Sequence, residues 1–176
     1  MNITSLQPGE IEITPTDTVP PQISVISPMN RDYLRSEILP VTLTVMDVDS
    51  GVTTSSIAFN GNPIANNSNL DLFFEKLGSQ LLSASSTDFL NNVATTSVTF
   101  RIIATIDSTI SDINRATALG WIIDVKTRDS FLKTLNKAVK IETKIETLEE
   151  QAPGKPKITK KIEKLEKRLD QILGKE

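Results

Sequence analysis

The chain has 176 residues, enough for one or two small domains, and contains neither cysteine nor histidine. These absences exclude a disulfide framework, a Ser-His-Asp triad, a Cys-His dyad and a His-containing zinc site within the chain. The net charge of −3 conceals an asymmetry, because residues 1–105 carry four Lys and Arg against ten Asp and Glu, whereas residues 106–176 carry fifteen against twelve. Ser, Thr and Asn give way to Lys, Glu, Ile and Leu at the same point, which predicts a domain boundary there.

Residues 1–18 are predicted to form a tail or a linker from a preceding domain, since two prolines, a glycine and several threonines interrupt them. Within them, GEIEIT offers at most a short strand. No apolar run typical of a signal peptide follows Met1. No stretch approaches the roughly 18 apolar residues of a membrane span, so none is expected. A cytosolic protein and a fragment of a longer exported protein both fit these observations.

From residue 19 to residue 105, short segments alternate apolar and polar side chains, with turn residues between them. This period of two predicts about six or seven strands packed as an all-β sandwich, because no room exists for the helical crossovers of a parallel sheet. Asn60-Gly61 predicts a two-residue hairpin, since both residues tolerate positive φ. The alternating positions are Ile23, Val25, Val41, Leu43, Val45, Ile57, Phe59, Leu70, Leu72, Phe74, Leu82, Ala84, Ser86, Val98, Phe100 and Ile102.

Residues 106–176 change to an apolar spacing of three and four, which predicts a separate all-α domain, an antiparallel three-helix bundle. In the first helix, Thr109 and Asp112 have the spacing of a capping box. Gly120 is expected to end that helix in a left-handed conformation, and Trp121 to fold back into the core.

The second helix is expected from about Val125 to Glu150, with Asp124 or Thr127 as its cap. In the third helix, apolar residues at a 4-3-4-3 spacing predict a heptad seam. The residues expected to face inward are Phe131, Leu132, Leu135, Ala138, Val139, Ile145 and Leu148 in the second helix, and Ile158, Ile162, Leu165, Leu169 and Ile172 in the third.

Residues 19–105 contain VPPQISVISP, LPVTLTVMDVDSGV and LDLFFEKLGSQLLSASSTDFLNNVATTSVTFRI in that order. Pro-Pro opens the segment, D-x-x-SGV joins two strands, and an Asn-rich turn leads to the last strand. With these motifs the chain resembles the immunoglobulin-like domains of bacterial secreted and surface proteins, which implies an immunoglobulin-like sandwich. Asn91-Asn92 departs from the family's Gly-Asn, although Asn tolerates the same left-handed conformation.

Residues 106–176 contain LGWIIDVKTRDSFLKTLNKA, and here the chain is similar to the small helical modules at the C-termini of bacterial exported proteins that are called FIMAH-like. That resemblance implies an accessory binding or anchoring module rather than a catalyst. It also implies a further helix after Glu176.

The stretch MDVDSGV, residues 46–52, is the first candidate metal site. In an EF-hand register that begins at Asp47, the fifth, sixth and twelfth positions are Gly51, Val52 and Ala58, so three requirements of a calcium loop fail. A plain turn between two strands is therefore favoured, with Ser50-Gly51 supplying the turn.

A weaker calcium hypothesis rests on the pole of the sandwich. In an immunoglobulin-like sandwich, the loop after the second strand and the last hairpin lie at one end, which would bring Asp47 and Asp49 near Asp88. Asn91 and Asn92 would add oxygen atoms for calcium or for the hydroxyl groups of a sugar. No other cofactor is expected.

The lysines of KITKKIEKLEKR, residues 157–168, invite a nucleic-acid hypothesis. Glu163, Glu166 and Asp170 interrupt the basic residues, and this helix has no aromatic residue to stack on bases. A solvated helix face is therefore favoured, and no nucleic-acid partner is expected.

The leading hypothesis is a non-catalytic accessory region of an exported or surface bacterial protein, at an extracellular or cell-surface location. It would act as a spacer, an anchor or a weak adhesin for glycan or cell wall, with the rest of the parent polypeptide as its partner. The alternative is a self-assembling structural subunit of a surface layer, sheath or filament, joined through edge strands or the heptad seam. A Lys- or Ser-based hydrolase finds no activated nucleophile in the sequence.

Overall fold

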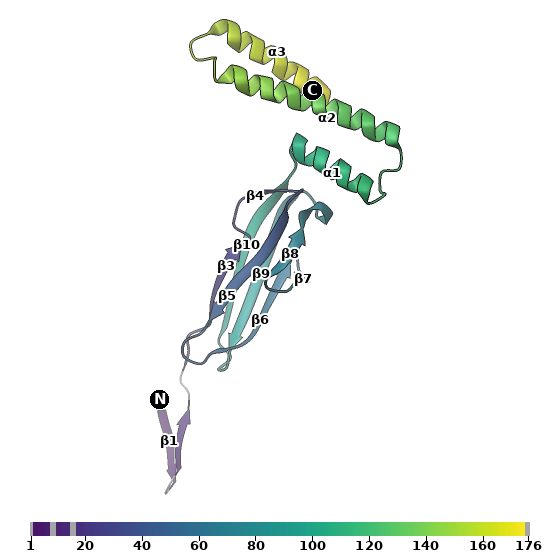
Figure 1. The fold of residues 1–176 in the computed structure, drawn as a ribbon. Coiled ribbons are helices and arrows are strands. Elements are labelled where there is room, and N and C mark those ends of the chain that lie inside the picture. The colour runs from purple at the N-terminus through teal and green to yellow at the C-terminus, as the bar shows by residue number, and fades with distance from the viewer. Residues whose placement is uncertain (1, 8–9, 15–16, 175–176) are drawn as a thin grey trace. The chain divides into compact units, whose positions relative to one another are not determined.

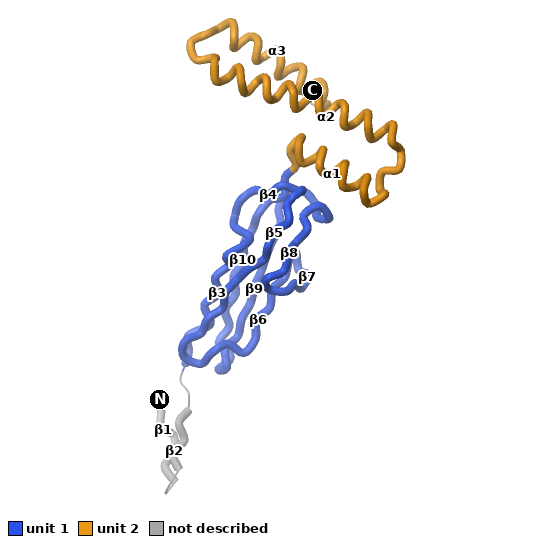
Figure 2. The backbone as a smooth tube through the Cα atoms, viewed as in Figure 1, with its two compact units in different colours: residues 1–103 blue, residues 104–176 orange. Residues whose placement is uncertain are grey.

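The structure, a computed structural model, describes residues 2–7, 10–14 and 17–174. The chain forms two compact units, residues 1–103 and residues 104–176, which have different colours in Figure 2. The first unit contains β-sheets and the second contains three α-helices (Figure 1). The expected order, a β-rich part followed by a helical part, is confirmed.

The N-terminal segment contains two strands, β1 (Asn2–Gln7) and β2 (Glu10–Thr14), which pair as an antiparallel hairpin. The sequence indicated GEIEIT as a possible short strand, which β2 matches, whereas β1 was not predicted. The interpretation of residues 1–18 as a tail or a linker from a preceding domain stays a prediction. The alternation in GEIEIT is the period of a strand, and the partner strand supplies the backbone hydrogen bonds that a lone short strand lacks.

Two sheets build the body of the first unit. One sheet has three strands in the order β3–β5–β8, and the other has five strands in the order β4–β10–β9–β6–β7. Strands that are neighbours in a sheet pair antiparallel, except that β4 lies parallel to β10. The bounds are β3 (Gln22–Ser27), β4 (Asp32–Leu34), β5 (Ile38–Met46), β6 (Val52–Phe59), β7 (Asn62–Pro63), β8 (Ser68–Asp71), β9 (Gly78–Asp88) and β10 (Val93–Ile103).

One buried apolar cluster lies between the two sheets. The alternation of apolar and polar side chains directs one face of each strand into this cluster, as the period of two predicted. Phe100 is central, with the ring of Tyr33 edge-on at 5.4 Å and the ring of Phe59 stacked at 6.0 Å between centroids. The buried members are Tyr33, Leu39, Val41, Leu43, Ile57, Phe59, Leu72, Leu82, Ala84, Phe100 and Ile102.

The predicted Asn60-Gly61 hairpin is confirmed between β6 and β7. Asn60 has a φ of 48° and Gly61 a φ of 83°, and Phe59 pairs with Asn62 across the turn. The predicted strand through Phe74 is wrong, because β8 ends at Asp71 and a 3₁₀ helix, η1 (Leu72–Phe74), follows it. Asp71 caps that helix, and its turn buries Leu72 while Phe74 is 55% exposed.

The second unit contains α1 (Ile106–Ala118), α2 (Val125–Glu149) and α3 (Pro156–Leu173). The predicted inward residues of α3 all join one apolar cluster with α2, so the heptad seam is confirmed. The cluster draws on α2, α3 and their connection, while α1 packs on α2. Its members are Ile141, Ile145, Leu148, Ala152, Ile158, Ile162, Leu165, Leu169 and Ile172.

The ends of α1 differ in part from the prediction. Thr105, not Thr109, is the N-cap, and it exchanges reciprocal hydrogen bonds with Ser108, whose side chain accepts from the Thr105 amide. Gly120 has the predicted left-handed conformation, with a φ of 75°. The Trp121 amide folds back to donate to the Ala116 carbonyl, but its side chain is 61% exposed, so its predicted place in the core is wrong.

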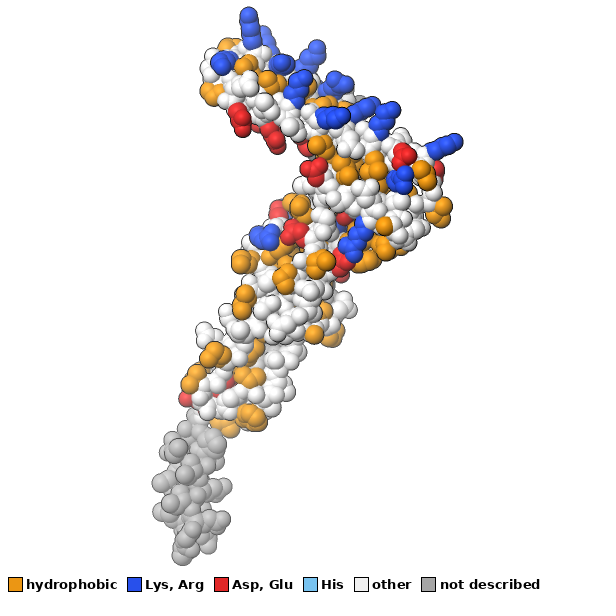
Figure 3. All heavy atoms as spheres, viewed as in Figure 1, with side chains coloured by type: hydrophobic (Ala, Val, Ile, Leu, Met, Phe, Trp, Pro, Cys, Tyr) orange, Lys and Arg blue, Asp and Glu red, His pale blue; other side chains and the backbone are white. Residues whose placement is uncertain are grey.

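Of the two caps proposed for α2, Asp124 is the one observed, because its carboxylate accepts from the Lys126 amide. Phe131, predicted to face inward, is exposed, whereas Ile141 belongs to the buried set. On the face drawn in Figure 3, Lys and Arg side chains gather over the helices. None of the described helices is long and apolar enough to cross a membrane.

Candidate cation site

The connection between β5 and β6 is a turn held by Asp47. Its Oδ1 atom accepts hydrogen bonds from the amides of Ser50, at 2.9 Å, and Gly51, at 2.6 Å. Gly51 has a φ of 82°, a conformation that glycine adopts without the steric cost of a side chain. MDVDSGV is thus a turn between two strands, as favoured from the sequence.

The last residue of β9, Asp88, organises the hairpin that leads into β10. Its Oδ1 atom accepts from the amides of Leu90 and Asn92, both at 2.8 Å, and its Oδ2 atom accepts from the Asn92 side-chain amide at 2.7 Å. Only 1% of Asp88 is exposed. Burial alone would raise the pKa of Asp88, but the hydrogen bonds from Asn92 and Leu90 outweigh it and hold the pKa below its ordinary value.

Asp17 lies five residues before the start of β3. Its Oδ1 atom accepts from the Val19 amide at 2.8 Å, and its backbone carbonyl accepts from the Asn92 side chain at 3.2 Å. Its Oδ2 atom is buried and has no hydrogen-bond partner. An acceptor that is buried without a donor costs free energy unless another group satisfies it.

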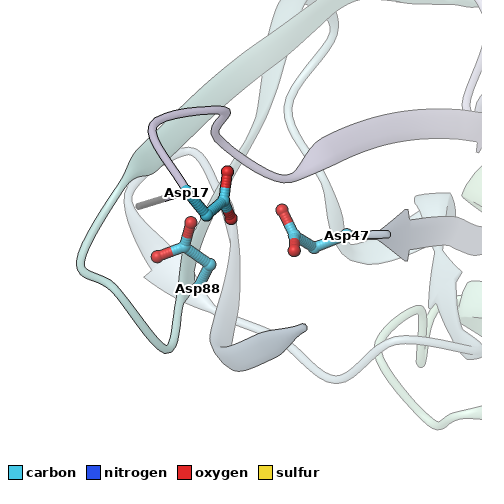
Figure 4. Close-up of side chains that lie close together, drawn as sticks. All are labelled: Asp17, Asp47 and Asp88. Carbon is cyan, nitrogen blue, oxygen red and sulfur yellow. The ribbon is translucent and has the colours of Figure 1, made fainter. Parts of the chain in front are cut away.

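These three aspartates form one cluster, in which each contributes a carboxylate oxygen and the three oxygens lie within 4.8 Å of one another. Figure 4 shows the carboxylates of Asp17 and Asp88 side by side, with that of Asp47 facing them. Strand pairing explains why the three aspartates lie close together. Gln22 at the start of β3 pairs with Met46 at the end of β5, and Val52 at the start of β6 pairs with Asp88.

The structure thus brings together two of the three aspartates proposed from the sequence. Asp49 lies in the same loop as Asp47 but outside the cluster, and Asn91 and Asn92 lie in the hairpin of Asp88, where the Asn92 side chain donates to Asp88. Sequence reasoning missed Asp17. A signal was present, because a residue shortly before a strand lies near the end of the sheet at which the antiparallel partner strand finishes.

An all-carboxylate cluster can hold a hard cation such as Ca²⁺. Among the described residues, none of the three carboxylates forms an ion pair. Three of the four basic residues of the β unit act elsewhere: Arg31 pairs with Glu37, Arg101 with Asp32, and Arg35 lies over the ring of Phe73. The negative charge of the cluster is therefore not balanced by side chains of the described residues.

Comparison with known proteins finds similarity to solved structures alone. No family model matches the chain, and no curated protein matches it. The fibronectin(III)-like modules of Clostridium thermocellum CbhA are similar in structure, with a TM-score of 0.39 and 16% sequence identity over 48% of this chain and 47% of that one. The chain therefore spans about half the length of that structure. The FIMAH-like resemblance of the helices stays a prediction.

Proposed function

We propose that the chain is a non-catalytic accessory region of an exported or surface bacterial protein, in which an immunoglobulin-like sandwich and a helical module serve as spacer or anchor. The observation that carries this proposal is that each unit buries its own apolar cluster. A unit that buries its own apolar side chains can be joined to other units in series without depending on contacts with them, and a spacer requires this independence.

The strand arrangement supports the immunoglobulin-like assignment of the sandwich. Successive strands divide between two sheets, with β3, β5 and β8 in one and β6, β9 and β10 in the other. This is the division found in immunoglobulin-like folds, in which the first, second and fifth strands face the third, sixth and seventh.

The buried polar groups support a structural role. Gln80 accepts from Asn60 and donates to two backbone carbonyls, and Ser86 donates to the Thr54 carbonyl. Ser108 completes the α1 cap, and Asp88 holds its hairpin. Each of these hydrogen bonds stabilises a local turn, a strand or a helix end, so none of these groups is left over as an activated nucleophile or base.

The test uses the purified full chain. We expect no hydrolysis of peptide, ester or glycoside substrates above background, and retention on insoluble glycan or bacterial cell wall no stronger than micromolar to millimolar. Turnover that scales with enzyme concentration and survives repurification would overturn the non-catalytic part of the proposal.

A second function, self-assembly, is favoured by one observation. The connection between α1 and α2 exposes several apolar side chains close together in sequence, including Ile123 at 87% and Trp121 at 61%. Exposed apolar patches of this kind mark association surfaces. Three of the four edge strands of the two larger sheets, β4, β7 and β8, are less suited to pairing between copies because they have only two to four residues each, whereas β3 has six.

Sedimentation velocity over a range of concentrations separates the two functions. Self-assembly predicts a sedimentation coefficient that rises with concentration and returns to the monomer value in Ile123→Ser. Val48→Ser is the matched control, because Val48 is equally exposed, at 89%, but lies in a loop of the β unit. A monomer at all concentrations would exclude self-assembly through this surface.

A further inference from the structure

We infer that Asp17, Asp47 and Asp88 form a Ca²⁺ site that binds the segment leading into the sandwich to the end of the sandwich itself. Two independent observations carry this inference. The three carboxylates converge within 4.8 Å, and the Oδ2 atom of Asp17 is buried without any hydrogen-bond donor. A cation at the centre of the cluster satisfies that atom and neutralises the mutual repulsion of the carboxylates.

The hydrogen bonds leave suitable oxygen atoms for a cation. Asp47 and Asp17 each accept their amide hydrogen bonds at Oδ1, and among the described residues Oδ2 of each accepts none. Oδ2 of Asp88 accepts the hydrogen bond from the Asn92 side chain, and a carboxylate oxygen retains a second lone pair. Asp17 and Asp47 can therefore ligate through Oδ2 while Oδ1 holds the loop, and Asp88 can ligate through a remaining lone pair.

The spacing is compatible with Ca²⁺. Oxygen ligands of Ca²⁺ lie at about 2.3–2.6 Å, so two of them on opposite sides of the ion are roughly 4.6–5.2 Å apart. The separations of at most 4.8 Å in the cluster do not exceed this range. Mg²⁺ requires near-ideal octahedral geometry at about 2.0–2.1 Å, whereas Ca²⁺ accepts flexible geometry, so Ca²⁺ is the better match for carboxylates held by three separate segments. Water completes the coordination shell of Ca²⁺.

Affinity is expected to be low. Three protein carboxylates are fewer than the ligands of a sensor loop, and the residues around Asp47 lack the glycine and the glutamate of an EF-hand register. The dissociation constant should lie at about 10⁻⁴–10⁻³ M, the range of extracellular modules. Occupancy would then follow the millimolar calcium found outside cells.

The three aspartates come from three separate segments, so binding would join them. Asp17 belongs to the chain that enters the sandwich, Asp47 to the β5–β6 turn and Asp88 to the β9–β10 hairpin. Bound Ca²⁺ would therefore fix the direction in which the preceding segment leaves the sandwich. The Asn92 side chain of the hairpin already donates a hydrogen bond to the Asp17 carbonyl of that segment.

Amide resonances give a direct test with the full chain. The amides of Val19, Gly51 and Leu90 donate to Asp17, Asp47 and Asp88 respectively, so each reports on one ligand. Titration with CaCl₂ to about 10 mM should shift all three resonances with one common dissociation constant near 10⁻⁴–10⁻³ M. The Phe73 amide, which donates to Asp71 away from the cluster, should not shift.

Variants distinguish the site from nonspecific calcium binding. Asp17→Asn and Asp47→Asn keep an oxygen acceptor for the local amide, and each should weaken Ca²⁺ binding at least tenfold. Asp49→Asn removes the same charge from the same loop as Asp47 but lies outside the cluster, so it should bind as the wild type does. No shift of the three resonances in the wild type, or equal weakening by Asp49→Asn, would overturn the inference.

Discussion

Asn60 shows how one side chain fixes the β6–β7 turn to the neighbouring strand. Its Nδ2 atom donates to Gln80 at 2.7 Å, and its Oδ1 atom accepts from the Leu81 amide at 3.0 Å. Its backbone also has a positive φ, which Asn tolerates better than most residues. The turn signal Asn-Gly thus carries both a backbone conformation and a specific pair of side-chain contacts.

We predict that Asn60→Ala lowers the free energy of unfolding of the β unit by about 1–3 kcal/mol, because it leaves the buried Gln80 oxygen without its donor and places alanine at positive φ. Asn60→Gly removes the same hydrogen bonds but relieves the backbone, so its loss should be smaller. Urea unfolding measures both. A loss near zero in both variants would show that the hydrogen bonds to Gln80 and Leu81 contribute nothing.

Asp88 makes the stability of the β unit depend on pH. Its pKa in the folded state lies below the ordinary value of 3.8, so its contribution is present in full above that value and is lost as pH falls through the lower, folded-state pKa. We predict that Asp88→Asn is less stable than the wild type at neutral pH and that the difference shrinks below about pH 4. Urea unfolding of both proteins in the presence of EDTA, measured across this pH range, tests the prediction. A difference that is independent of pH would contradict the assignment.

Residues at the ends of elements were the hardest to predict from the sequence. Thr109 and Thr105 both precede apolar helical residues, and the choice between them depends on where β10 ends. Trp121 follows the helix-ending glycine as predicted, but whether its ring is covered depends on the packing of α1 and α2, which local spacing does not specify. Asn60-Gly61 was predictable because its conformation is set by the two residues themselves.

The α2–α3 hairpin illustrates which features of an element carry its stability. Its apolar seam was predictable because the 4-3-4-3 spacing puts Ile158, Ile162 and Leu165 on one side of a helix whatever its partner is. The acidic end of α2 and the basic start of α3 lie near the same connection, yet exposed charges contribute only about 0–1 kcal/mol per pair.

We predict that Ile162→Ala destabilises the helical unit by about 2–5 kcal/mol, because Ile162 is buried in the seam. Lys161→Ala, its exposed neighbour, should change the stability by less than about 0.5 kcal/mol. Thermal melts followed by circular dichroism at 222 nm compare the two. Equal effects would mean that the seam contributes no more than the solvated face of α3.

At the scale of the whole molecule, the two units should unfold separately. We predict that residues 17–103 alone give a dispersed amide spectrum that overlays the corresponding signals of the full chain, because their buried cluster includes no residue of the helices. Collapsed amide dispersion in that fragment would show that the β unit needs the helices to fold. The fragment retains Asp17 and hence all three aspartates of the cluster.

The sequence predicted most of the strands of the β unit, the three helices and two members of the cluster, since these follow from periodicity and from the end of the sheets at which loops gather. It did not predict Asp17, because residues 1–18 were interpreted as a tail and the cluster depends on where that tail meets the sandwich. The β1–β2 pairing was missed for a related reason. A segment with few apolar residues gives a weak signal until its partner strand is considered.

The parallel pairing of β4 with β10 has a mechanical consequence. The chain enters the sandwich at one end, beside Asp47 and Asp88, and β10 leaves it at the other. Tension applied through the two ends would pull β4 and β10 in opposite directions along their length, loading the pairs from Asp32–Arg101 to Leu34–Ile103 together, in shear. Bonds loaded in this way must break nearly at once, whereas the rungs of a hairpin pulled at its open end break one after another. We therefore expect the β4–β10 pairing to resist stretching, as the spacer role that we propose would require.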